Sequence, residues 1–198
     1  MRAVRRAVRL LGASRERYDE APGLEEEARR CRTGAFDGGA AWMAAGLGAL
    51  RGAPVARPAR AWQAWGTAKY GACAVAATVL AAVAVAAGVW WLAPALVVLA
   101  FYGVEAQLVF LFPALLDGED RPLAASRRLT VAAGGTVSVM ATVLPLAVVM
   151  LFGGFVGQGF VRCWCLGCLA VLLWYEALRQ GREVVEDGVA GRAVEGGG

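Results

Sequence analysis

The stretch Ala93–Leu116, APALVVLAFYGVEAQLVFLFPALL, decides the fold of this chain. It is 24 residues long and contains a single charged side chain, Glu105, near its midpoint. As a helix it would measure roughly 36 Å, which is enough to cross a hydrocarbon core of about 30 Å. A carboxylate at that depth is costly and rarely faces lipid. We therefore expect other membrane helices to pack around this segment and shelter Glu105.

The composition of the chain also indicates a membrane protein. Hydrophobic residues make up 59% of the 198 residues, whereas a soluble domain has about 45–50%. The first 69 residues contain 13 of the 20 Lys and Arg residues but only 7 of the 16 Asp and Glu residues. A basic segment beside a membrane span sets topology and contacts anionic lipid headgroups. No nucleic-acid recognition motif accompanies the charge, so we expect no nucleic-acid partner.

Three further apolar stretches predict membrane helices, so we expect an all-α, integral membrane four-helix bundle. The predicted spans cover residues 70–92, 93–116, 129–152 and 160–178; a short helical, basic cytoplasmic or interfacial region covers 1–69, and a partly disordered tail covers 179–198. Lys and Arg cluster before the first span, between the second and third, and after the fourth. The positive-inside rule then places both termini in the cytoplasm. Because the Ala/Arg/Gly-rich composition is typical of a GC-rich bacterial genome, we expect the bacterial inner (plasma) membrane.

The basic N-terminal region contains two helical patterns. Val4, Val8 and Leu11 recur at roughly helical spacing among arginines, which fits either an amphipathic helix on the membrane surface or a solvated helix. Phe36–Leu50 is apolar but has only 15 residues, and a span needs about 17–25. We interpret this second stretch as an interfacial or re-entrant helix.

A candidate membrane-embedded polar site consists of Glu105, Gln107, Tyr102 and Arg162. Tyr102 shares the helical face of Glu105, whereas Gln107 lies on the opposite face. Glu105 is either a hydrogen-bonded residue that joins helices or a carboxylate that handles protons or ions. Arg162 belongs to the first turn of the fourth span. It either extends to the membrane surface or turns inward and pairs with Glu105.

The cysteines form a second candidate site. Cys165 and Cys168 are separated by Leu166 and Gly167 and share a helical face, so they form a candidate redox pair. In this respect the chain resembles the vitamin K epoxide reductase family, whose four-helix bundle has a CxxC near the non-cytoplasmic end of its last helix. That resemblance implies thiol redox chemistry. The chain departs from the family in its first outer loop, which carries shuttle cysteines there and is little more than Ala93 and Pro94 here.

Three functional hypotheses remain open. The chain contains no histidine, which excludes His-ligated haem, His-ligated zinc hydrolysis and Ser-His-Asp catalysis. We expect no cofactor, no metal site and no catalytic residue. The favoured interpretation is a non-catalytic accessory protein or subunit of a membrane assembly, with a membrane-protein partner or a second copy of the chain. The alternatives are a small transporter or proton- and ion-handling protein that uses Glu105, and a membrane thiol oxidoreductase or lipid-modifying enzyme.

Overall fold

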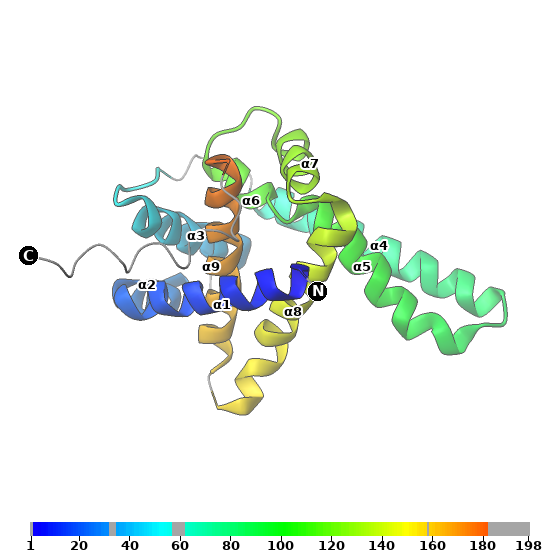
Figure 1. Cartoon of the computed structure of the whole chain (residues 1–198). Coiled ribbons are helices and arrows are strands. Elements are labelled where there is room, and N and C mark those ends of the chain that lie inside the picture. Colours follow the sequence, from blue (N-terminus) through cyan, green and yellow to red (C-terminus); the bar gives the residue numbers. More distant parts are fainter. Residues whose placement is uncertain (1, 32–34, 57–61, 158, 182–198) are drawn as a thin grey trace, which may run out of the picture.

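The computed structural model describes residues 2–31, 35–56, 62–157 and 159–181, and all regular elements in these ranges are helices (Figure 1). This confirms the predicted all-α class. In chain order the elements are α1 (Arg2–Glu20), α2 (Gly23–Cys31), α3 (Ala35–Arg51), α4 (Trp62–Ala86), η1 (Trp90–Leu92), α5 (Ala93–Leu108), α6 (Leu111–Leu116), α7 (Pro122–Ala132), α8 (Gly135–Phe152), η2 (Gly153–Val156) and α9 (Phe160–Arg179). Most of the tail predicted to be partly disordered lies outside the described residues.

Four segments of the described chain are long and apolar enough to cross a membrane. They are Trp62–Ala86, Trp90–Leu116, Gly135–Val156 and Phe160–Arg179. The chain is therefore the multi-pass, four-helix membrane bundle that the sequence predicts. Within it α4 packs along α5, α5 contacts α8, and α8 packs along α9.

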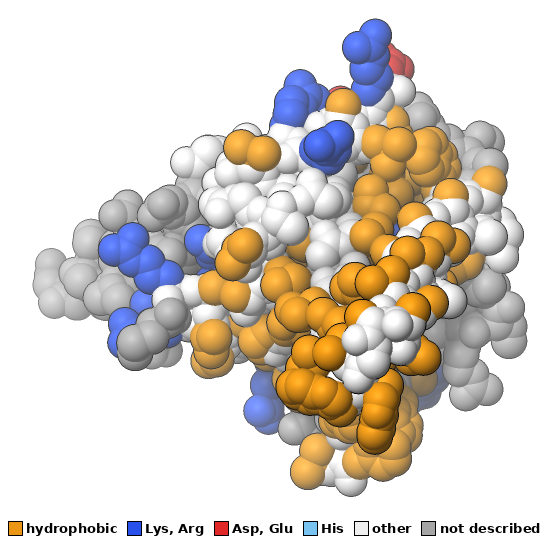
Figure 2. All heavy atoms as spheres, turned by 90° about the vertical axis from the view of Figure 1, so that its right-hand side faces the viewer, with side chains coloured by type: hydrophobic (Ala, Val, Ile, Leu, Met, Phe, Trp, Pro, Cys, Tyr) orange, Lys and Arg blue, Asp and Glu red, His pale blue; other side chains and the backbone are white. Residues whose placement is uncertain are grey.

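The hairpin formed by α4 and α5 extends away from the other helices (Figure 1). Hydrophobic side chains gather over this part of the molecule (Figure 2). Val79, Val83, Trp90 and Trp91 are all more than half exposed. A contiguous apolar surface of this kind is costly in water and suits a hydrocarbon environment, with the tryptophans near a membrane interface.

Helix α9 has protein on several sides. It contacts α1, α2, α3, α7 and α8, and 50% of its most apolar stretch is buried, compared with 22–28% in the other three spans. Trp174 and Tyr175 are almost completely buried, and the ring of Phe110 meets Trp174 edge-on at 5.1 Å. Aromatic pairs with this geometry add to the stability that burial itself provides. Helix α9 thus joins the N-terminal helices to the membrane helices.

The contact between α8 and α9 depends on small residues. The sequence places Gly159, Cys163 and Gly167 on one helical stripe of the kind that permits close packing. In the structure a Cβ atom on Gly167 would collide with the side chain of Met150, and one on Gly153 would collide with the sulfur of Cys163. Two of the three stripe positions therefore lie in the contact, Gly167 against α8 and Cys163 against the first residue of η2.

Helix α1 packs on α8 and α9 through a different stripe from the one that the sequence suggests. Its buried residues are Ala7, Leu10, Ser14 and Tyr18, whereas Val4 and Val8 are 51% and 63% exposed. The sequence pattern selected the larger apolar side chains. The structure instead buries a stripe in which the small residues Ala7 and Ser14 alternate with the large residues Leu10 and Tyr18, so that small and large side chains interlock with the neighbouring helices.

The second predicted span is interrupted near its C-terminal end. Helix α5 stops at Leu108, and α6 begins at Leu111. Pro113 explains the break, because proline has no N–H and its ring would collide with the carbonyl group four residues earlier, that of Val109. The hydroxyl groups of Ser126 and Thr130, both in α7, compensate for the lost helix bonds. They donate to the carbonyl oxygens of Gln107 at 2.8 Å and Ala106 at 2.9 Å.

The third predicted span, residues 129–152, is also interrupted. Helix α7 ends at Ala132, and α8 begins at Gly135. Gly134 and Gly135 have φ angles of +98° and +82°, which is the left-handed region that glycine adopts without steric cost. The guanidinium of Arg6 donates to the carbonyl oxygen of Ala133 at 3.0 Å, so a positive charge from α1 lies at the C-terminal end of α7, where the helix dipole favours it.

The segment that the sequence leaves as interfacial or re-entrant forms α3. The side chain of Trp42 is fully buried there, and its Nε1 donates to the carbonyl oxygen of Leu24 in α2 at 3.0 Å. Helix α3 also contacts α4 and α9. It is therefore covered by protein on several sides, and its depth in the bilayer stays a prediction.

Candidate functional site

Lys69 of α4 and Glu105 of α5 form an ion pair within the membrane-spanning helices. The ammonium Nζ lies 2.8 Å from the carboxylate Oε1, and the two side chains are only 4% and 13% exposed. The predicted boundary at residue 70 leaves Lys69 just outside the first span. Helix α4 instead begins at Trp62, which places Lys69 about two turns inside it.

Aromatic rings surround the ammonium group of Lys69. Its Nζ lies 5.2 Å from the ring centroid of Tyr70 and 5.3 Å from that of Phe112. Phe36 of α3 stacks on both of these rings, with centroid separations of 5.6 and 6.5 Å. The faces of aromatic rings attract cations, most strongly where water is excluded. The rings therefore help the carboxylate to stabilise a charged lysine away from water.

A cavity of about 640 Å³ lies beside this pair. Residues of α3, α4, α5, α8 and α9 line it, and they include Phe36, Phe101, Leu146, Met150 and Trp164. Lys69 and Glu105 are the only charged residues among its described lining residues. Sites for small molecules are typically concave, mostly apolar and about 300–1,000 Å³ in volume, with a few polar groups. The cavity has these features.

The two oxygens of Glu105 have different surroundings. Oε1 is bound by Lys69, whereas the contact of Oε2 among the described residues is the thiol of Cys73 at 3.9 Å. A thiol at that separation is a weak donor. Oε2 thus retains the capacity to accept a further hydrogen bond, and Glu105 is among the residues that line the cavity.

Tyr102 and Gln107 take separate positions around Glu105. Tyr102 lines the same cavity. Gln107 is directed away, and its amide Nε2 donates to the hydroxyl of Thr136 in α8. The structure therefore brings Tyr102 to Glu105 and places Gln107 in the polar contacts that join α5, α7 and α8.

Arg162 does not reach Glu105. Its Nη2 atom lies 2.7 Å from Oδ1 of Asp19 in α1, and its guanidinium lies over the ring of Tyr18. The arginine side chain is 42% exposed. The cation beside Glu105 is Lys69, and Arg162 instead ties the start of α9 to the end of α1.

Cys165 and Cys168 are both free thiols in the structure. Cys165 is buried in a hydrophobic cluster that also contains Tyr18 and Leu24. Cys168 contributes to the lining of the cavity beside Glu105. Cys168 also packs against the cluster that contains Cys165, and the redox activity of the two residues stays a prediction.

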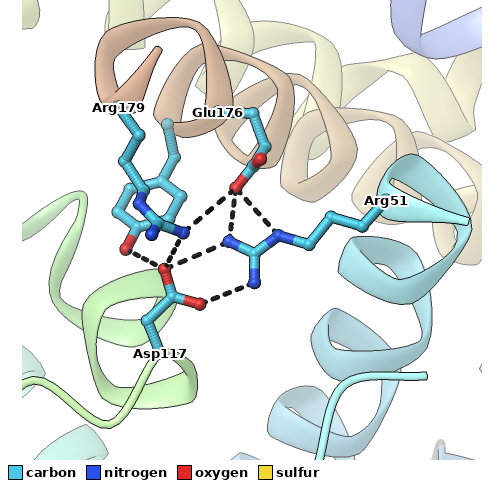
Figure 3. A network of polar contacts seen from close by, with 5 residues as sticks. Arg51, Asp117, Glu176 and Arg179 are labelled. Carbon is cyan, nitrogen blue, oxygen red and sulfur yellow. Dashed lines mark hydrogen bonds and ion pairs between the residues drawn. The ribbon is translucent and has the colours of Figure 1, made fainter. Parts of the chain in front are cut away.

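A second polar cluster joins the ends of α3, α6 and α9 (Figure 3). Arg51 donates to both carboxylate oxygens of Asp117, at 2.7 and 3.1 Å, and also to Glu176 at 2.5 Å. Arg179 and the hydroxyl of Tyr175 donate to Oδ2 of Asp117 at 2.5 and 2.6 Å. The opposing charges are matched, so this cluster is a structural connection between helices that are far apart in the sequence.

The cluster alters the acid–base behaviour of its members outside the spans. Burial alone would raise the pKa of Asp117, but the hydrogen bonds from Arg51 and Tyr175 and the charges of Arg51 and Arg179 hold that pKa below its usual value. Hydrogen bonding to Asp117 likewise raises the pKa of the Arg51 guanidinium, and burial opposes this only in part. Asp117 therefore remains ionised at neutral pH.

Sequence reasoning missed both the partner of Glu105 and the bidentate contact of Arg51. Lys69 and Glu105 are the only charged residues in the sequence between 61 and 116. Because the two spans in this range are adjacent and antiparallel, the pattern of one positive and one negative charge could have predicted the pair. The turn at residues 87–92 places positions near 69 opposite those near 105 to 110. No comparable pattern connects Arg51 with Asp117, because that contact depends on where α3 packs.

No protein-family model, curated protein or solved structure matches this chain. The class of the protein, a multi-pass membrane protein with four spanning helices, rests on its own sequence and structure.

Proposed function

We propose that this membrane protein is a non-catalytic component of a membrane assembly that holds an amphipathic molecule from the bilayer in the cavity beside Lys69 and Glu105. The observation that carries the proposal is the buried ion pair on the wall of an otherwise apolar cavity. An ion pair in such a place is costly to desolvate. A ligand with one polar group and an apolar body would use both the pair and the apolar lining.

The mutual neutralisation of the two charges favours binding over catalysis. The carboxylate of Glu105 lies 2.8 Å from the ammonium group of Lys69, so each charge has its counter-ion within the protein. Two charges that bind each other on the cavity wall are better suited to orienting a ligand than to reacting with it.

Retention of bilayer molecules by a cavity-filling variant tests this proposal. Ala147 lines the cavity from α8, so Ala147→Phe fills part of its volume. Ala82 is exposed on the α4–α5 hairpin, and Ala82→Phe adds the same bulk outside the cavity. We expect purified wild-type protein and Ala82→Phe to retain a bound amphiphile detectable by native mass spectrometry after delipidation. Ala147→Phe should retain much less, and equal retention by all three proteins would contradict the proposal.

A second candidate function is proton or cation transfer through Glu105. It is favoured by the end of helix α5 at Leu108, within one turn of Glu105, because transporters place ion sites where membrane helices are interrupted. The test is flux of protons or monovalent cations into proteoliposomes. Glu105→Gln should abolish the flux while thermal unfolding shows a folded protein, and a wild-type protein without flux would exclude this candidate.

A further inference from the structure

The two charges beside the cavity also indicate the chemical class of its ligand. This step rests on the proposed function. We infer that the cavity selects an uncharged amphiphile whose hydroxyl group donates a hydrogen bond to Oε2 of Glu105 and whose apolar chain or ring system fills the rest of the cavity.

Charge balance disfavours an ionic ligand. Lys69 and Glu105 neutralise each other at 2.8 Å, and no other charged residue is among the described lining residues. An anionic headgroup would compete with Glu105 for Lys69, and a cationic one would compete with Lys69 for Glu105. Either would leave one buried charge without its partner, which is the costly outcome for an ion pair in a low-dielectric site. A neutral headgroup leaves the pair intact.

The exposure of the two partners decides between a hydrogen-bond donor and an acceptor on the ligand. Lys69 is 4% exposed, and its ammonium group lies against Glu105 and the rings of Tyr70 and Phe112. Glu105 is 13% exposed, and among the described residues its Oε2 atom has only the thiol of Cys73 at 3.9 Å. The accessible group is therefore a carboxylate oxygen, which accepts hydrogen bonds only. A hydroxyl group is the simplest uncharged donor that a membrane amphiphile can offer to this oxygen.

The remaining lining defines the apolar part of the ligand. Phe36, Phe101, Leu146, Met150 and Trp164 come from four different helices and surround the cavity. Aromatic and sulfur-containing side chains pack well on alkyl chains and fused rings. Because spanning helices form most of the walls, the ligand would enter from the bilayer rather than from water.

Three probes with the same long alkyl chain and a diazirine group test this inference. One ends in a hydroxyl, one in a carboxylate and one in a primary amine. Each is added to wild-type protein in phosphatidylcholine nanodiscs, photolysed, and mapped by mass spectrometry to peptides that contain Met150 or Trp164. We expect the alcohol to label these peptides about tenfold more than either ionic probe, since a loss of about 1.4 kcal/mol corresponds to that factor.

Two variants should change which probe labels the cavity best, because each removes one charge of the ion pair. Glu105→Gln leaves Lys69 without a carboxylate, so the carboxylate probe should become the best label. Lys69→Met leaves Glu105 without an ammonium, so the amine probe should become the best label. Glu119→Gln, in the loop before α7, is the matched control and should keep the preference for the alcohol. Thermal unfolding checks that each variant is folded.

The outcomes distinguish a wrong ligand class from a wrong cavity function. Equal labelling of the cavity peptides by all three probes overturns the ligand class but leaves the proposed cavity function standing. No labelling of those peptides above the level on the exposed hairpin contradicts both. If the variants do not fold, the wild-type comparison alone decides the ligand class.

Discussion

Nζ of Lys69 lies 2.8 Å from Oε1 of Glu105 in adjacent membrane-spanning helices, and water reaches little of either side chain. The contact joins α4 and α5 near their open end, whereas the turn over residues 87–92 joins them at the other end. Both ends of the hairpin are therefore fixed, and its middle is held by small side chains such as Cys73 and Ala77, which are buried.

Removal of one member of this pair should destabilise the fold more than removal of both. Lys69→Met or Glu105→Leu leaves an uncompensated buried charge, which we expect to cost about 3 kcal/mol. The double variant replaces the pair by apolar side chains and should regain most of that loss. Unfolding of the purified protein in mixed detergent micelles gives the four free energies of a double-mutant cycle. Additive losses in the double variant would show that the two residues do not interact.

The charged cluster around Asp117 should be sensitive to removal of its central carboxylate. Asp117→Asn removes the negative charge to which Arg51 and Arg179 donate, and we expect a loss of about 2 kcal/mol in the free energy of unfolding. Glu119→Asn, in the exposed part of the same loop, is the matched control and should change little. Thermal unfolding in detergent measures both. A loss for Asp117→Asn no larger than that of the control would contradict a stabilising role.

Acid should weaken the same cluster. The pKa of Asp117 is lowered in the folded protein by Arg51 and Tyr175, so its contribution is present above the ordinary aspartate pKa of about 3.9 and is lost as the pH falls through the lower folded value. We expect the unfolding temperature of the wild type to fall below about pH 4. The Asp117→Asn variant should fall less over the same range, and parallel curves for the two proteins would place the acid-sensitive group elsewhere.

The helix count and class were predictable because they depend on apolar runs longer than a bilayer requires. The interruptions at Leu108 and Gly134 were not predicted, although Pro113 and the Gly134–Gly135 pair were visible. Both breaks fall inside apolar runs, and a run of apolar residues indicates residence in a membrane rather than continuity of a helix. What makes the break in α5 tolerable is the pair of hydroxyl groups from α7.

The sequence indicated the carboxylate of the candidate site but not the cation that pairs with it. Glu105 was evident as a carboxylate in an apolar run, and Tyr102, expected on the same helical face, lines the cavity beside it. The partner was missed because Lys69 was assigned to the polar side of a span boundary, and such boundaries are uncertain by several residues. Arg162 was considered instead because it lies within a predicted span, but its partner, Asp19, belongs to a helix whose packing the sequence pattern did not indicate.

The hydroxyl groups of Ser126 and Thr130 should matter because they bind carbonyl groups that the break in α5 leaves without helix partners. Thr130→Val keeps the shape of the side chain and removes its donor to Ala106, and we expect a loss of about 1–2 kcal/mol. Thr78 is exposed on the hairpin, so Thr78→Val is the matched control with no expected loss. Denaturation in mixed micelles compares the two. Equal stability of both variants would show that the carbonyl of Ala106 finds another donor.

The close approach of α8 and α9 at Gly167 should not tolerate a large side chain at this position. A Cβ atom there would collide with the side chain of Met150, so Gly167→Leu should overpack the contact and lower the free energy of unfolding by about 1–3 kcal/mol. Shortening the opposing side chain in Gly167→Leu/Met150→Ala should recover part of the loss, because the new side chain then has space. A Cβ atom on Gly71 would have no atom of a neighbouring helix within 4 Å, which makes Gly71→Leu the matched control. If Gly167→Leu is no less stable than Gly71→Leu, the two helices are not held at the distance that the glycine permits.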